Sequence, residues 1–269
     1  MKIVFRKDEF SEVWDGVFYK KLSNYPEITD WELRTIADFI KYEAMNGRSC
    51  EIDCEDETIL KALERIDTDP EKYKSVPPPQ KITECTACPL RRGCETKFVC
   101  HTAPVENALN IFKTGSLLSA VRARGLSAAQ LKKESRNAAG DPEDYFDYVM
   151  FAWGNCQAGD RLVMERKLKR FPTDEDLGKK LTPGVRFYFR YDDLSAHPNA
   201  VFDGVLPVKV KDEVKLQGLV YTIIIPEAER SSFENVIPDE LRSKVHYIKN
   251  DCADIWEWSE KVYSYVEAL

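Results

Sequence analysis

The stretch ECTACPLRRGCETKFVCHTAPVENALNIFKTGSLLS, residues 84–119, joins two signals that organise the rest of the chain. Its first half holds four cysteines within sixteen residues, at Cys85, Cys88, Cys94 and Cys100. Its second half begins at His101, where a candidate strand gives way to the periodic apolar residues of a short helix. The sequence therefore places a candidate metal site directly before a candidate active-site strand.

The four cysteines have the composition of a metal knuckle. Two thiolates with two residues between them can bind one ion, because a tight turn brings both sulfurs to one side. Four thiolates suit zinc or a [4Fe-4S] cluster, and we expect a structural role because no coordination position would stay open. A cluster held by only the first three cysteines would leave one position open. The alternative to metal is a loop of reduced, partly buried cysteines.

Composition and charge restrict the class of protein. At 269 residues, with 43% hydrophobic and 32% charged residues, the chain has the make-up of a soluble globular protein. Its net charge of −7 gives no general attraction to nucleic acid or anionic membranes, so such binding would require a local basic patch. No apolar run approaches the roughly 20 residues of a membrane span, and the N-terminus lacks a signal-peptide core. We predict a cytoplasmic protein without a membrane partner, a compartment in which clustered cysteines favour metal over disulfides.

The N-terminal part, residues 1–75, is predicted to be a small, mainly helical α+β unit. Apolar spacing after Asp8 predicts a helix over residues 9–21, and Thr29 with Glu32 has the spacing of a capping box. The expected elements after the first helix are a helix over 29–47, a strand over 49–53 and a helix over 56–66. Residues 67–82 are expected to be an exposed break, and residues 76–100 a proline-rich linker with the cysteine knuckle.

From Phe98 onward, strands alternate with short helices, which predicts a mixed or antiparallel β core within a domain over residues 101–269. The expected strands cover residues 98–102, 148–153, 185–191, 219–225 and 245–248. The expected helices begin at residues 105, 127, 238 and 255. The fold class is therefore α+β.

The run CHTAPVENAL at residues 100–109, followed by Ile111-Phe112, Gly115 and Leu117-Leu118, resembles the opening of the DarT-like branch of the ADP-ribosyltransferase superfamily. In that branch a strand ends in His-Thr or a similar pair, an Asn-Leu-containing helix follows, and a Gly-Leu step leads out. The resemblance covers at most residues 98–250. It implies a β core of ADP-ribosyltransferase type, NAD as substrate, and transfer of ADP-ribose to an unknown macromolecular acceptor.

The resemblance also implies roles for particular residues. His101 and Thr102 would anchor the nicotinamide ribose, and Asn107 in the following helix belongs with the NAD-binding residues. The catalytic acid would be Glu213, although Gln217 occupies a slot closer to the later strand. The aromatic that stacks on nicotinamide would come from Tyr148, Phe151, Trp153, Tyr188 or Tyr191. The arginine that grips the pyrophosphate would be Arg122, Arg124 or Arg136.

Other interpretations stay open at this point. His101 could be a strand-end residue hydrogen-bonded in place, or a further metal ligand beside Cys100. Arg186, Tyr188 and Arg190 share one face of their strand and would suit a phosphate-bearing ligand, or else form a solvated edge-strand face. The rival functions are a metal-stapled module that binds a nucleotide, a nucleic acid or a protein without catalysis, and an iron–sulfur enzyme or sensor. Nucleic-acid binding has support only from local basic sequences such as residues 90–92 and 122–124.

Overall fold

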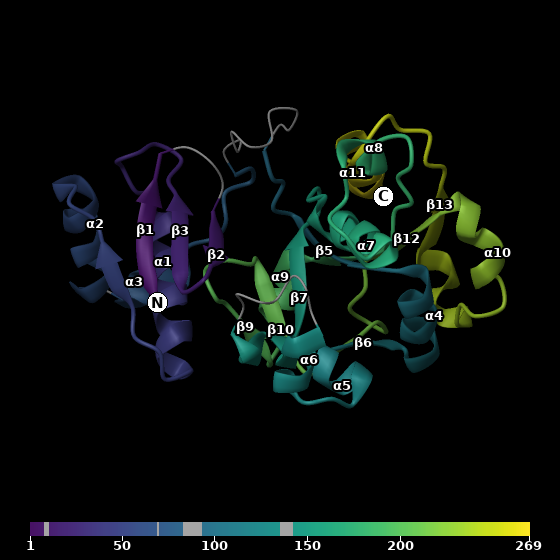
Figure 1. The fold of residues 1–269 in the computed structure, drawn as a ribbon, viewed down its shortest axis with the longest axis horizontal. Coiled ribbons are helices and arrows are strands. Elements are labelled where there is room, and N and C mark those ends of the chain that lie inside the picture. The colour runs from purple at the N-terminus through teal and green to yellow at the C-terminus, as the bar shows by residue number, and fades with distance from the viewer. Residues whose placement is uncertain (8–10, 69, 83–92, 135–141) are drawn as a thin grey trace.

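The computed structural model describes residues 1–7, 11–68, 70–82, 93–134 and 142–269. The chain is an α+β protein with two main sheets of mixed strand orientation, which confirms the predicted fold class. Figure 1 shows the N-terminal sheet with its helices on one side of the molecule and the larger C-terminal sheet on the other.

The N-terminal sheet has the strand order β2-β3-β1-β4. β1 runs parallel to β3 and to β4, whereas β2 pairs with β3 in the antiparallel sense. Apolar side chains from three helices pack against the strand residues Ile3 and Phe18 and bury both. The bounds are β1 Lys2–Arg6, β2 Glu12–Trp14, β3 Val17–Lys21, α1 Asp30–Met45, β4 Glu51–Asp53, α2 Glu57–Thr68 and α3 Pro70–Lys74.

The helix predicted over residues 9–21 is wrong, because β2 and β3 form a hairpin there. Asp15 and Gly16 both adopt positive φ, at 46° and 80°, as a two-residue hairpin turn requires. The apolar residues of this segment fit helical spacing, but the Asp-Gly pair is the stronger local signal. The expected cap Asp8 lies outside the described residues.

The two predicted helices that follow are confirmed. Thr29 accepts a hydrogen bond from the Glu32 backbone while the Glu32 carboxylate accepts one from the Thr29 backbone, so the capping box of α1 is present. The predicted exposed break over 67–82 is wrong in part, because α3 lies within it and Tyr73 is buried in the core. Residues 76–80, which contain the proline run, lie outside helices and strands.

The C-terminal sheet has seven strands in the order β13-β12-β8-β5-β7-β10-β9. β13 runs parallel to β12, and every other neighbouring pair is antiparallel. The predicted strands are therefore confirmed in position, within a few residues. Their bounds are β5 Phe98–Ala103, β7 Tyr148–Trp153, β8 Val185–Arg190, β9 Ala200–Val201, β10 Val208–Lys211, β12 Thr222–Pro226 and β13 Val245–Ile248.

Both faces of this sheet are buried, and β5 shows it most clearly. Val99 and Ala103 point into one core, which α4, α10 and a two-stranded β6/β11 ribbon cover. Phe98 and Cys100 point into the opposite core, which α7 and α11 cover. The bounds are α4 Val105–Thr114, β6 Ser116–Leu118, α5 Ala120–Arg124, α6 Ala128–Glu134, α7 Ala158–Leu168, α8 Asp174–Leu177, α9 Tyr191–Ser195, β11 Glu213–Lys215, α10 Arg230–Phe233 and α11 Ile255–Glu267.

The outer face of α1 joins the two sheets. Tyr42 donates a hydrogen bond to the carboxylate of Asp144, and Arg48 Nη1 lies 2.7 Å from the other oxygen of that carboxylate. Gly204 has φ of 71°, and a Cβ there would lie 1.9 Å from the Thr35 carbonyl oxygen, so the turn before β10 touches α1 backbone. Among the described residues, no helix is long and apolar enough to cross a membrane.

Candidate functional site

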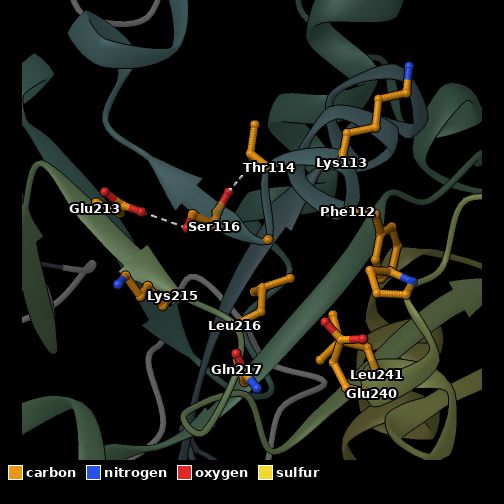
Figure 2. Close-up of a pocket in the computed structure, with 12 residues that line it drawn as sticks. Phe112, Lys113, Thr114, Ser116, Glu213, Lys215, Leu216, Gln217, Glu240 and Leu241 are labelled. Atoms are coloured by element: carbon orange, nitrogen blue, oxygen red, sulfur yellow. Dashed lines mark hydrogen bonds between the residues drawn. The ribbon is translucent and has the colours of Figure 1, made fainter.

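An open, polar groove of about 390 Å³ lies where the end of α4, the β6/β11 ribbon and the segment around residues 238–241 meet. Figure 2 shows Ser116 and Thr114 at its centre, Glu213 and Lys215 on one side, and Glu240 on the other. The lining side chains come from parts of the chain more than a hundred residues apart. Acidic, basic and amide groups all face this space, so it can accept a ligand with mixed charge.

Glu213 is the most organised acidic residue of the groove. The Ser116 hydroxyl donates a hydrogen bond of 2.6 Å to Oε1, and Arg122 Nη1 lies 2.8 Å from Oε2. The hydrogen bond from Ser116, followed by that from Arg122, lowers the pKa of Glu213, with a smaller contribution from the charge of Lys215. The carboxylate is therefore ionised at neutral pH. Its side chain is 29% exposed and so remains accessible from solvent.

Local backbone geometry places Glu213 and Arg122 together. Asp212 leaves β10 with φ of 65°, and the chain then turns into β11, which pairs antiparallel with β6. The Ser119 amide donates a 2.8 Å hydrogen bond to the Asp212 carbonyl, and the Ser119 side chain caps α5. The helix that carries Arg122 is thus anchored at Asp212, the residue before Glu213.

His101 lies in the interior of the sheet. Its Nδ1 is 3.0 Å from the Met150 carbonyl oxygen, and its ring meets the edge of Phe151 at 6.1 Å. A carbonyl oxygen only accepts, so Nδ1 carries the proton and Nε2 is left as an acceptor. β5 pairs with β7 only at Val99 and Cys100, so the His101 side chain bonds to β7 just beyond the last paired residue. Burial lowers the pKa of His101, which keeps the ring neutral.

The two residues predicted to be catalytic do not face each other. Leu117 and Val214 point from the ribbon into the core that contains Val99 and Phe151, beside His101. Glu213 is the neighbour of Val214 along β11 and points to the opposite face of the ribbon. Within the described part of the chain, no hydrogen bond or ion pair joins His101 to Glu213.

The predicted NAD-binding residues are dispersed. Of those that the structure describes, Arg122 lies beside Glu213, whereas Arg136 is outside the described residues. Thr102 points to the other face of the sheet, where a Cβ on Gly159 would lie 2.4 Å from its hydroxyl oxygen. Asn107 is exposed on α4. Tyr148 lies with its ring 4.7 Å from the Lys209 ammonium, at the junction with α1.

Tyr188 and Arg186 form a closed polar cluster instead of a ligand face. Both side chains are fully buried, and Tyr188 donates a 3.1 Å hydrogen bond to the Gly154 carbonyl. Arg186 Nε lies 2.9 Å from Oδ2 of Asp160, and Nη2 also binds Ser259. Neither sequence-based interpretation of this strand holds, because β8 is an interior strand whose Arg186 is satisfied inside the protein.

The cysteine knuckle is described only at its end. Cys85 and Cys88 lie outside the described residues, Cys94 is partly exposed, and Cys100 is buried in β5. Burial raises the pKa of the Cys100 thiol to about 12, and its sulfur lies 3.8 Å from the Thr102 hydroxyl. Among the described residues, no group of three or more Cys, His, Asp or Glu side chains is arranged to hold a metal.

Sequence reasoning missed Ser116 and the structural role of Asn155. Ser116 lies 97 residues from the carboxylate that it binds, and nothing in the local pattern announces that pairing. Asn155 donates a 2.8 Å hydrogen bond to the Gly93 carbonyl and accepts one of 3.3 Å from the Glu95 amide. Its buried amide thereby fixes the backbone on either side of Cys94.

No protein-family model, curated protein or solved structure matches the chain. No relative therefore indicates a ligand for the groove, and its chemistry is inferred from its own side chains. Glu213 supplies a fixed negative charge, and Arg122 and Lys215 supply positive charges near it. Such a site can stabilise a developing cation on a ligand that also carries phosphate.

Proposed function

We propose that the protein binds NAD in this groove and transfers ADP-ribose to an unknown macromolecular acceptor, with the ionised carboxylate of Glu213 as the catalytic group. The observation that carries the proposal is the ionised Glu213 carboxylate, held by Ser116 and Arg122 at the wall of an open groove. The resemblance of residues 98–118 to ADP-ribosyltransferases supports the same assignment.

The proposed reaction needs a negative charge at one place. The bond between C1′ of the ribose and the nicotinamide nitrogen breaks, and its electron pair leaves with nicotinamide. Positive charge then develops on the ribose, where a preorganised carboxylate stabilises it more than bulk water does. The acceptor attacks C1′ and loses its proton to the Glu213 carboxylate. Arg122 and Lys215 match the negative charge of the pyrophosphate.

Replacing Glu213 with glutamine should lower the rate of nicotinamide release from NAD by about 100-fold or more, since a neutral amide cannot stabilise the ribosyl cation. The amide keeps the shape of the carboxylate, so NAD affinity should change little. Nicotinamide release and NAD binding would be measured on the same preparations. Glu234→Gln, an exposed residue outside the groove, removes the same charge and should keep wild-type turnover. Wild-type turnover in Glu213→Gln would remove Glu213 from the mechanism.

A second candidate function is NAD or nucleotide binding without transfer. The position of His101 favours it, because this side chain is hydrogen-bonded within the sheet and does not line the groove. Calorimetry of NAD binding, together with the assay of nicotinamide release, separates the two candidates. If the protein only binds, the wild-type protein binds NAD and releases no nicotinamide. Release by the wild-type protein would exclude it.

We propose in addition that the cysteine knuckle binds zinc or an iron–sulfur cluster through Cys85, Cys88 and Cys94. Partly exposed Cys94 fits a ligand role, with its backbone fixed by the flanking contacts of Asn155. Cys100 does not fit, because its sulfur is packed in the core against Thr102.

Cys94→Ser should therefore lose most of the bound metal, whereas Cys100→Ser should keep it and lose stability instead. Elemental analysis of the purified proteins measures the metal, and a brown colour distinguishes a cluster from zinc. Cys252→Ser, distant in sequence, serves as the control. Loss of metal from Cys100→Ser would restore the four-cysteine set predicted from the sequence.

A further inference from the structure

The outward side of α7 and the turn after it carry a concentrated positive charge. Residues 161–171, RLVMERKLKRF, contain five basic residues and a single acidic one, Glu165, which is buried. This charge stands out on a chain whose net charge is −7. Six of the exposed members define a surface that we call the basic patch: Leu162, Arg166, Lys167, Lys169, Arg170 and Phe171.

Helical spacing gathers the patch on one side. Leu162 and Arg166 are four residues apart, which places them along one stripe of α7, and Lys169 follows directly as the left-handed C-cap residue of the helix. Val163 and Met164, by contrast, are buried. The inner side of α7 is therefore fixed to the protein, and the stripe faces solvent.

Two apolar side chains lie among these charges. Phe171 is 74% exposed and Leu162 is 38% exposed. Arg170 Nη1 donates a 2.9 Å hydrogen bond to the Phe171 carbonyl and also binds Asp176 at 2.7 Å, so the backbone that carries the phenyl ring is tied down. Among the described residues, the Phe171 ring contacts no other aromatic ring or cation. An exposed apolar side chain on an anchored backbone, next in sequence to basic residues, suits a membrane-surface site.

We propose that the basic patch binds the surface of an anionic membrane, with Phe171 and Leu162 entering the boundary between headgroups and acyl chains. Lys and Arg side chains are attracted to anionic headgroups, and an apolar side chain at the same level adds the gain of leaving water. Arg166, Lys167, Lys169 and Arg170 supply the charge, and Arg170 also forms an ion pair with Asp176. This inference is independent of the function proposed for the groove.

The apolar residues distinguish a lipid surface from nucleic acid as the occupant. Phosphate groups of either would attract the cations. Bases, however, bind by stacking on flat aromatic or guanidinium groups. Of the flat groups in the patch, the Arg170 guanidinium is held by Asp176, which leaves Phe171 and Arg166 beside an aliphatic leucine. Leu162 gains from hydrocarbon and not from stacking.

The test measures sedimentation of the full chain with vesicles. Vesicles of phosphatidylcholine alone should bind none of the protein. Vesicles in which about one third of the lipid is phosphatidylglycerol should bind the protein, and added salt should weaken this binding. Arg166→Glu combined with Lys169→Glu should weaken this binding more than about 25-fold. Leu162→Ser combined with Phe171→Ser should weaken it about tenfold without changing the salt dependence.

Matched controls separate the patch from general effects. Lys61→Glu with Lys74→Glu makes the same change of net charge at exposed lysines of α2 and α3 and should leave binding unchanged. Met45→Ser removes another exposed apolar side chain and should also leave it unchanged. Equal losses in the controls, or no vesicle binding at all, would overturn the proposal. So would binding of a single-stranded oligonucleotide that depends on Arg166 and Lys169 while vesicles remain unbound.

Discussion

Replacing Arg186 with alanine is expected to lower the free energy of unfolding by about 3–5 kcal/mol, because the change leaves the Asp160 carboxylate buried without its counter-charge. Neither side chain of this ion pair is exposed to solvent. Arg186 also binds Tyr188 at 3.1 Å and Ser259 at 2.6 Å, so its loss breaks contacts between β8, α7 and α11 at once. Within the ranges that the structure describes, the remaining Asp160 then keeps only the 2.7 Å hydrogen bond from the Gly184 amide.

Urea unfolding of Arg186→Ala and Arg190→Ala provides the measurement. Arg190 lies on the same strand but is exposed, with its guanidinium 4.7 Å from the Tyr221 ring, so its loss should cost far less. Replacing both partners, as Asp160→Leu with Arg186→Met, should recover much of the lost stability because no unpaired charge remains. Equal stability of Arg186→Ala and Arg190→Ala would show that the pair contributes nothing specific.

Lys209→Met is expected to have an effect of similar size, about 3–5 kcal/mol, since it leaves Asp203 as an unpaired buried charge. Lys209 is fully buried on β10, and its ammonium lies 2.9 Å from Asp203 in an ion pair that is not aligned as a hydrogen bond. The ammonium also lies 3.7 Å from the ring centre of Tyr42 and 3.8 Å from that of Tyr145. Cation–π contact with these rings offsets part of the cost of burying the charge.

The loss of stability in Lys209→Met should arise at the junction between α1 and the C-terminal sheet, since Tyr42 belongs to α1. Thermal or urea unfolding measures the loss, and Lys211→Met, an exposed lysine of the same strand, is the control. Adding Asp203→Asn to Lys209→Met should restore part of the stability by removing the unpaired charge. A variant Lys209→Met as stable as Lys211→Met would mean that Asp203 finds its compensation elsewhere.

The sequence predicted elements best where local chemistry alone determines them. The capping box at Thr29 and the apolar stripe that follows specify α1 without help from distant residues. The segment before it failed because its apolar spacing fits two structures, and the Asp15-Gly16 turn selects the hairpin. β6 and β11 were not predicted at all, because the ribbon that they form depends on pairing between segments distant in sequence.

The site was harder to predict than the fold because it depends on pairs distant in sequence. Glu213 was named from a resemblance, but its partner Ser116 is supplied by a strand 97 residues earlier. Tyr188 was expected to face a ligand because β8 was not recognised as an interior strand. Its sequence VRFYFR is apolar at alternate positions on one face and carries a paired arginine on the other, so both faces are buried.

The contacts around Cys94 have a consequence for how the chain tolerates change. The Ile82 amide donates a 2.9 Å hydrogen bond to the Cys94 carbonyl, and Asn155 holds Gly93 and Glu95. Residues 82 and 93 are thus pinned beside one another by groups that belong to the rest of the protein. Because Asn155 follows β7, these hydrogen bonds join the approach to β5 to the end of its neighbouring strand. A substitution that removes the Asn155 amide would therefore release the backbone on both sides of Cys94 from the sheet.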